Sequence, residues 1–151
     1  MDMQPRVTAI EILLVEDAPG DVRWTTEALK EGKIRNNLSV VGDGIEALAF
    51  LHGQGKYAHA ARPDLILLDL NLPRKNGLQV LQEIKASPEL KKIPVVILTM
   101  SEDEKDVLRS HNLKANYYIT KPVSPQEFIK VVRSIENFWL SILKTSDHHL
   151  A

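Results

Sequence analysis

The fold of this chain is decided by residues 63–73, whose sequence is PDLILLDLNLP. The apolar run LILL within it is too short for a helix and shows no alternation with polar residues. Because Pro63 and Pro73 bound the segment, the run predicts a strand that is buried on both faces of a parallel sheet. Asp69 closes this strand at the edge where such sheets bind ligands, although an aspartate there could also simply cap the next turn.

Three other predicted strands also end on polar residues, which strengthens the case for a site at Asp69. Parallel strands bring their carboxyl ends to one edge, so the residues that follow these strands should converge there. The edge would then hold three carboxylates, one hydroxyl and one ammonium group. The strands are residues 10–15, followed by Glu16 and Asp17, residues 93–98, followed by Thr99, and residues 115–119, followed by Thr120 and Lys121.

Size and composition favour one ordinary domain and exclude several classes of function. A chain of 151 residues is long enough for its own core, and a formal net charge of −1 argues against a nucleic-acid partner. The absence of cysteine excludes disulfides, thiolate zinc sites and a cysteine nucleophile. No apolar run is long enough to cross a membrane and the first residues lack a signal-peptide core, so we expect a soluble, cytoplasmic protein.

Predicted helices separate the strands, and a weak further strand at residues 38–41 completes the set. This alternation predicts a doubly wound α/β fold with five parallel strands and helices on both faces. We expect a flexible arm over residues 1–8, one folded domain over residues 9–144 and a flexible tail over residues 145–151. The expected helices span residues 19–31, 45–53 and 77–86, a fourth begins at Ser101, and the last runs from Pro125 to Leu143.

The residues expected at the sheet edge suit phosphoryl transfer. Crowded carboxylates repel one another unless a cation lies between them, and oxygen ligands favour a hard ion such as Mg²⁺. An aspartate carboxylate can attack phosphorus and form an aspartyl phosphate. Such a reaction mainly requires neutralisation of the three equatorial oxygens. A metal ion, the Lys121 ammonium, and the Thr99 hydroxyl with backbone N–H groups would neutralise one oxygen each.

These residues resemble those of the receiver domains of two-component response regulators, over residues 9–140. The resemblance rests on the pair Glu16-Asp17, residues 69–73 with Gly77 beyond them, Thr99, and the pair Lys121-Pro122. It implies a receiver domain with strand order 2-1-3-4-5, phosphorylated by a sensor histidine kinase. It also implies a signalling protein rather than an enzyme, one that promotes its own phosphorylation and slow autodephosphorylation.

The resemblance implies a role for each site residue. The peptide bond between Lys121 and Pro122 is expected to be cis. Met100 stands where the family usually has a small residue, and its larger side chain would narrow access to Asp69. By resemblance, Asp69 is the phosphoacceptor and Lys121 pairs with the phosphoryl group. Asp17 and Asp69 bind Mg²⁺ directly, together with the main-chain carbonyl of Asn71, and Glu16 acts on the metal through water. Thr99 and Tyr118 form a switch.

Softer features resemble the small response regulators that are paired with cyanobacterial phytochromes. They are residues 69–75, the long loop before Pro63 and the pair Phe138-Trp139 near the end of the last helix. This resemblance implies that a phytochrome is the donor kinase.

Three rival functions fit the sequence less well. An aspartate-nucleophile phosphatase of the haloacid dehalogenase kind would need an acid two residues after the nucleophile, where Asn71 stands. A pseudo-receiver would lack Asp69, Lys121 or an acid of the first pair, and all are present. A flavodoxin-like cofactor binder would carry a phosphate loop rich in glycine, serine and threonine after the first strand, where Glu16 begins the sequence EDAP.

The last predicted helix suggests how the signal leaves the protein. The chain ends just after this helix, so we expect its output to be a change in association with another protein. The apolar residues of the helix cover an arc of about 200°, which is wider than one sheet face requires. The alternative is that the tail or the fourth helix covers the surplus. We expect a homodimer surface formed by Phe138, Trp139, Ile142 and Leu143.

Overall fold

The computed structural model describes residues 9–32, 35–100, 108 and 117–134. Strands and helices alternate along these residues, as the sequence predicts. The elements are β1 (Ile10–Val15), α1 (Pro19–Glu31), β2 (Asn36–Val41), α2 (Gly44–Leu51), the 3-10 helix η1 (Gly55–Tyr57), β3 (Leu65–Asp69), α3 (Gly77–Ala86), β4 (Val95–Thr99), β5 (Tyr117–Thr120) and α5 (Pro125–Ser134).

The five strands form one parallel sheet in the order β2-β1-β3-β4-β5, which confirms the predicted order. The register pairs Val15 of β1 with Leu68 of β3, and Thr99 of β4 with Thr120 of β5. By this register the strands end almost level with one another. The polar residues at the ends of β1, β3, β4 and β5 consequently share one edge of the sheet.

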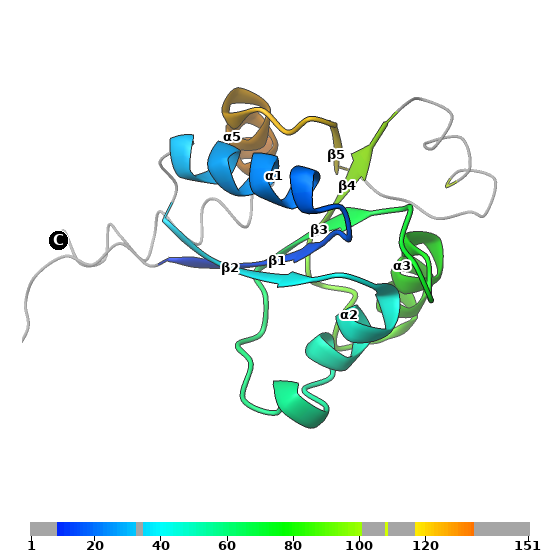
Figure 1. The fold of residues 1–151 in the computed structure, drawn as a ribbon. Helices are drawn as coiled ribbons and strands as arrows, with labels where there is room; N and C mark the ends of the chain where they lie inside the picture. The colour runs from blue at the N-terminus through cyan, green and yellow to red at the C-terminus, as the bar shows by residue number, and fades with distance from the viewer. Residues whose placement is uncertain (1–8, 33–34, 101–107, 109–116, 135–151) are drawn as a thin grey trace, which may run out of the picture.

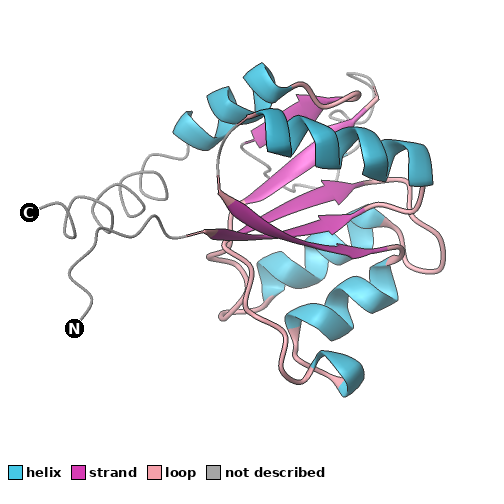
Figure 2. Cartoon of the chain, turned by 60° about the vertical axis from the view of Figure 1, so that its left-hand side comes forward, coloured by secondary structure: helices cyan, strands magenta, loops and turns pink. Residues whose placement is uncertain are grey.

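Helices α1 and α5 cover one face of the sheet, and α2 and α3 cover the other (Figures 1 and 2). Strand β3 is buried on both faces because it lies in the middle of the sheet. Its side chains alternate between the two cores: Leu65 and Leu67 pack with α1 and α5, whereas Ile66 and Leu68 pack with α2 and α3. Among the described residues, no helix is both long and apolar enough to span a membrane.

Some boundaries differ from those predicted. Strand β2 begins at Asn36 rather than residue 38, because its first residues pair with β1 from Ile10 onward despite the low strand propensity of asparagine. Strand β4 begins at Val95 rather than residue 93, after Pro94, which has no N–H to donate to a ladder. Residues 115–116, the start of the fourth predicted helix and residues 135–143 of the last one lie outside the described residues.

Trp24 ties α1 to the segment that precedes α5. Its indole Nε1 donates a hydrogen bond of 2.9 Å to the carbonyl of Val123, yet the residue is 56% exposed. The indole borders a cavity of about 390 Å³ between α1 and residues 122–125. The side chain therefore both links two elements and leaves an aromatic surface in solvent.

Gly77 is required where α3 begins, because the backbone of β3 passes too close for a side chain. A Cβ on Gly77 would lie 2.3 Å from the Asp69 carbonyl oxygen. We expect Gly77→Ala to lower the free energy of unfolding by roughly 1–3 kcal/mol, since backbone must move to admit the methyl group. Thermal and denaturant unfolding measure this.

Gly20→Ala is the matched control, because no atom lies within 4 Å of the added methyl group and Gly20 sits in the first turn of α1. This change should leave stability unaltered or raise it slightly. Equal stability of the two variants would contradict the close-approach argument.

Candidate functional site

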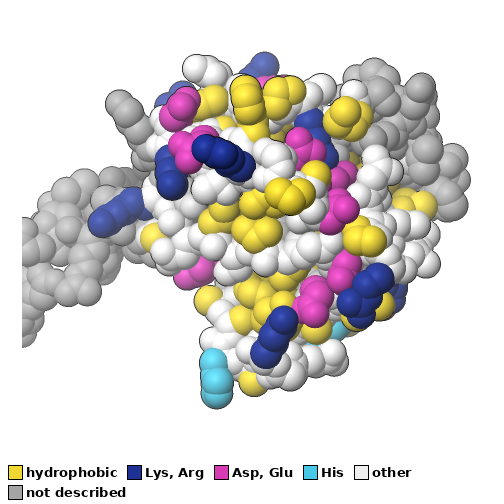
Figure 3. All heavy atoms as spheres, viewed as in Figure 1, with side chains coloured by type: hydrophobic (Ala, Val, Ile, Leu, Met, Phe, Trp, Pro, Cys, Tyr) yellow, Lys and Arg dark blue, Asp and Glu magenta, His cyan; other side chains and the backbone are white. Residues whose placement is uncertain are grey.

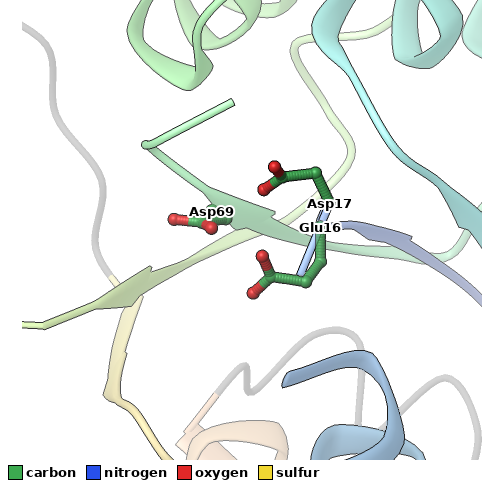
Figure 4. Close-up of side chains that lie close together, drawn as sticks. All are labelled: Glu16, Asp17 and Asp69. Atoms are coloured by element: carbon green, nitrogen blue, oxygen red, sulfur yellow. The ribbon is translucent and has the colours of Figure 1, made fainter. Parts of the chain in front are cut away.

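Three carboxylates meet at the carboxyl edge of the sheet (Figure 4). Glu16 and Asp17 follow β1, and Asp69 is the last residue of β3. One carboxylate oxygen of each lies within 4.8 Å of those of the other two, and the three groups point to the same side. Glu16 and Asp69 are buried, whereas Asp17 is exposed. Several acidic side chains also lie on this side of the molecular surface (Figure 3).

Lys121 brings a positive charge to these carboxylates from the end of β5. Its Nζ lies 2.7 Å from Glu16 Oε1 and 3.0 Å from Asp69 Oδ2, and its side chain is almost fully buried. Its backbone N–H donates to the Thr99 carbonyl, which fastens this segment to the end of β4. The peptide bond between Lys121 and Pro122 is cis, as predicted. Because the cluster holds three carboxylates and one ammonium, it keeps a net negative charge.

This crowding shifts the proton affinities of two of the groups. Burial and contact with Asp69 raise the pKa of Glu16 to about 7, although Lys121 acts in the opposite direction. Burial alone would lower the pKa of Lys121, but its contacts with Glu16 and Asp69 hold that pKa above its ordinary value. Lys121 is therefore charged at every physiological pH, and Glu16 gains its charge most readily when a further cation is present.

Asp69 is held on both of its oxygens. Oδ1 accepts a hydrogen bond of 3.0 Å from the backbone N–H of Asn71, and Oδ2 accepts one of 3.0 Å from Lys121 Nζ. The carboxylate therefore has a fixed orientation at the edge of the sheet. Asn71 itself is exposed in the loop that follows β3.

Thr99 places a hydroxyl group at the same edge of the sheet as Asp69. Asp69 pairs with Leu98 in the sheet, so Thr99 lies one residue further along the adjacent strand. Thr99 is 1% exposed, and its Oγ1 has no hydrogen-bond partner among the described residues. A buried hydroxyl without a partner costs free energy, so this position favours a ligand oxygen. The acidic cluster and this hydroxyl together fit a divalent metal ion with an oxyanion.

Tyr118 lies on the same face of the sheet as Thr99. It pairs with Ile97, two residues before Thr99, and packs half-buried against the core beneath α2 and α3. Met100, the residue after Thr99, is 62% exposed. The predicted dimer residues Phe138, Trp139, Ile142 and Leu143 lie outside the described residues.

Two contributors to this edge are not predicted from the sequence. Asp21, in the first turn of α1, places Oδ2 at 3.2 Å from Lys121 Nζ. Arg74 has a positive φ of 64° and pairs at 3.2 Å with Asp43, the residue that caps α2. The first turn of a helix that follows β1 must begin at this edge, and that signal could have identified Asp21. No comparable pattern marks Arg74.

The loop after β3 is also packed tightly against the start of α2. A Cβ on Gly44 would lie 1.9 Å from the carbonyl oxygen of Lys75, so only glycine allows this approach. With the Arg74–Asp43 pair, this contact fixes the loop that carries Asn71.

Comparison with known proteins identifies relatives along most of the chain. Residues 12–133 match the response regulator receiver domain family. The sequence is 51% identical over 129 residues to the response regulator Rcp1 of Synechocystis sp., a match that covers 85% of this chain and 88% of that protein.

Two solved structures agree with this match. The phosphorylated cyanobacterial phytochrome response regulator RcpA is 48% identical, with a TM-score of 0.72 and coverage of 89% of this chain and 96% of that one. The Mn²⁺-bound form of Rcp1 is 50% identical, with a TM-score of 0.69 and coverage of 87% and 94%. One relative is thus described with a phosphoryl group and another with a divalent metal.

The raised pKa of Glu16 predicts how stability depends on pH when no metal is added. The folded state holds the Glu16 proton up to about pH 7, whereas the unfolded chain releases it near the ordinary value of 4.5. The contribution of Glu16 to the free energy of unfolding is therefore fully present below pH 4.5 and is lost as the pH rises to about 7. With a metal chelator present, the free energy of unfolding of the wild type should fall between pH 4.5 and about pH 7. This fall should exceed that of the Glu16→Gln variant by roughly 1–3 kcal/mol.

Denaturant unfolding at several pH values measures this difference. Glu27→Gln, which removes an exposed acid on α1, should follow the wild-type curve. Parallel pH profiles for wild type and Glu16→Gln would contradict the raised pKa.

Proposed function

Since this chain belongs to the response regulator receiver domain family, a family of signalling proteins, we propose that Asp69 accepts a phosphoryl group from a sensor histidine kinase. The observation that carries the proposal is the setting of the Asp69 carboxylate. It is fixed between the Asn71 N–H and the Lys121 ammonium, beside two further acids at the carboxyl edge of the sheet. Phosphorylation would then change how the protein associates with a partner.

In the proposed reaction, an Asp69 carboxylate oxygen attacks the phosphorus of a phosphohistidine. The new O–P bond forms as the N–P bond breaks, and the imidazole nitrogen takes the electron pair. The Lys121 ammonium neutralises one phosphoryl oxygen, and the unpartnered Thr99 hydroxyl donates to another. Mg²⁺, when bound, would neutralise further charge on the phosphoryl group.

Three of the residues that would hold Mg²⁺, Glu16, Asp17 and Asp69, have carboxylate oxygens that already converge. Asp17 and Asp69 would bind it directly, together with the main-chain carbonyl of Asn71, and Glu16 would act through water. All are oxygen donors, which is the ligand set that Mg²⁺ prefers. Slow autodephosphorylation would follow from water attack at the same phosphorus. Met100, exposed beside Thr99, would restrict the approach of that water.

The proposed switch joins Thr99 to Tyr118. Both lie on the face of the sheet that packs under α2 and α3, two positions apart across neighbouring strands. Movement of the Thr99 hydroxyl toward a phosphoryl oxygen would open space on that face, into which the half-buried Tyr118 ring could turn. The phosphoryl group would shift this equilibrium only as far as it binds one state better.

The donor that we propose is a phytochrome with histidine kinase activity. The support is the similarity to RcpA, described as a cyanobacterial phytochrome response regulator, at 48% identity over 89% of this chain.

We further propose that residues 9–144 form the receiver domain, and that Phe138, Trp139, Ile142 and Leu143 form a homodimer surface. The support for the dimer is the wide apolar arc in the sequence of the last helix.

Substitution of Asp69 tests the phosphoacceptor. Wild type incubated with phosphoramidate and Mg²⁺ should gain the mass of one phosphoryl group, and Asp69→Asn should gain none, because the amide lacks the nucleophilic oxygen. Asp17→Asn should slow the reaction by at least about tenfold through loss of the metal. Intact-protein mass spectrometry over time measures both.

Glu27→Gln is the control, because it removes an exposed acid on α1 that pairs only with Lys30 in the described structure. It should react at the wild-type rate. Phosphorylation of Asp69→Asn at the wild-type rate would contradict the assignment of Asp69 as the phosphoacceptor.

Sedimentation tests the dimer. Unphosphorylated wild type at tens of micromolar should sediment as a dimer, and Trp139→Glu as a monomer, because a charge would enter the apolar surface. Trp24→Glu is the matched control: it alters the exposed tryptophan on α1 in the same way and should remain dimeric. A monomeric wild type would overturn the proposal.

A further inference from the structure

The Lys121 ammonium group is shared among three carboxylates that come from three different elements. Glu16 follows β1, Asp69 ends β3, and Asp21 lies in the first turn of α1. The distances from Nζ are 2.7 Å to Glu16, 3.0 Å to Asp69 and 3.2 Å to Asp21. An ammonium group has three N–H donors. Hydrogen bonds to Asp69 and Asp21 use two of them, and the Glu16 carboxylate lies at ion-pair distance from the same nitrogen.

Asp21 differs from the other two partners in its exposure to water. The side chains of Glu16 and Asp69 are 0% and 4% exposed, whereas that of Asp21 is 42% exposed. Separating Lys121 from Glu16 would leave a buried carboxylate without its cation, which is costly. Separating it from Asp21 would only return that carboxylate to solvent, where exposed ion pairs contribute little. Asp21 is therefore the partner that Lys121 can exchange most easily.

A phosphoryl group on Asp69 brings oxygens that also need the Lys121 donors. We propose that Asp21 is an exchangeable partner of Lys121, which competes with the phosphoryl group for the ammonium and thereby lowers the affinity of the site for it. The inference rests on the proposed function, because it concerns the same phosphoryl group. Asp21 acts only through Lys121, so it is not a catalytic residue. The sequence predicts only that Asp21 lies in the first turn of the helix over residues 19–31.

A simpler account is that Asp21 only stabilises the start of α1, where a negative charge interacts well with the helix dipole. That account predicts a lower melting temperature for Asp21→Asn and no change in ligand affinity. A third account is that Asp21 holds Lys121 in the productive position. It predicts weaker binding of a phosphoryl mimic after the same substitution. The competition that we propose predicts stronger binding, so the sign of the change separates all three.

The test is a titration with beryllofluoride, a phosphoryl mimic, in saturating Mg²⁺, followed by NMR on the full chain. Asp21→Asn should bind beryllofluoride roughly two- to fivefold more tightly than wild type. Asp21→Ser, a second neutral variant that suits the first turn of a helix, should behave in the same way. Asp21→Glu keeps the charge and should stay within about twofold of wild type. The gain should shrink in high salt, which screens a half-exposed charge.

Two controls make the result specific. Glu27→Gln removes the same charge from the same helix away from Lys121, and should leave beryllofluoride affinity unchanged. The Mg²⁺ affinity of Asp21→Asn without beryllofluoride should not rise, because removing a carboxylate cannot attract a cation. Unchanged or weaker beryllofluoride binding by both neutral variants would overturn the role of Asp21 alone. Failure of wild type to bind beryllofluoride would instead overturn the proposed function.

Discussion

The site depends on one buried ammonium group held against buried carboxylates. Taking such ions out of water costs several kcal/mol each, and only their mutual contacts offset that cost. Glu16, Asp69 and Lys121 come from the ends of three different strands, so they meet only when β1, β3 and β5 end level in the sheet. A slip of one residue in β3 would turn Asp69 to the opposite face. Sheet register and the electrostatics of the site are therefore a single constraint.

The loop after β3 is also held in a fixed position relative to Asp69, by contacts along its length. Its start is fixed because the Asn71 N–H binds the Asp69 carboxylate, and its end because Gly77 packs on the Asp69 backbone. Its middle is held by the Arg74–Asp43 pair at the start of α2. A functional loop on a rigid scaffold is a common arrangement. Here the scaffold contacts lie within a few residues of Asp69, the proposed phosphoacceptor, so core packing and site geometry are closely linked.

Sequence patterns predict this fold well where burial dictates the pattern. Strand β3 is identifiable because a strand covered on both faces cannot alternate, and the polar residue that ends it marks the edge. The pattern fails where partners across the sheet decide the outcome, as at Asn36, which joins β2 only because β1 lies alongside. It also fails for Asp21, since an acid in the first turn of a helix is common and its contact with Lys121 spans 100 positions of the chain.

Trp24 has a consequence for how this protein can be observed. Its indole N–H is bonded to the carbonyl of Val123, which follows Lys121 by two residues, while much of the ring faces water. Any displacement of the Lys121 segment must lengthen or re-form that bond and so alter the polarity around the ring. Indole fluorescence is sensitive to both, and the chain has only one other tryptophan, Trp139. The intrinsic fluorescence of Trp24 can therefore report displacement of the Lys121 segment without an attached dye.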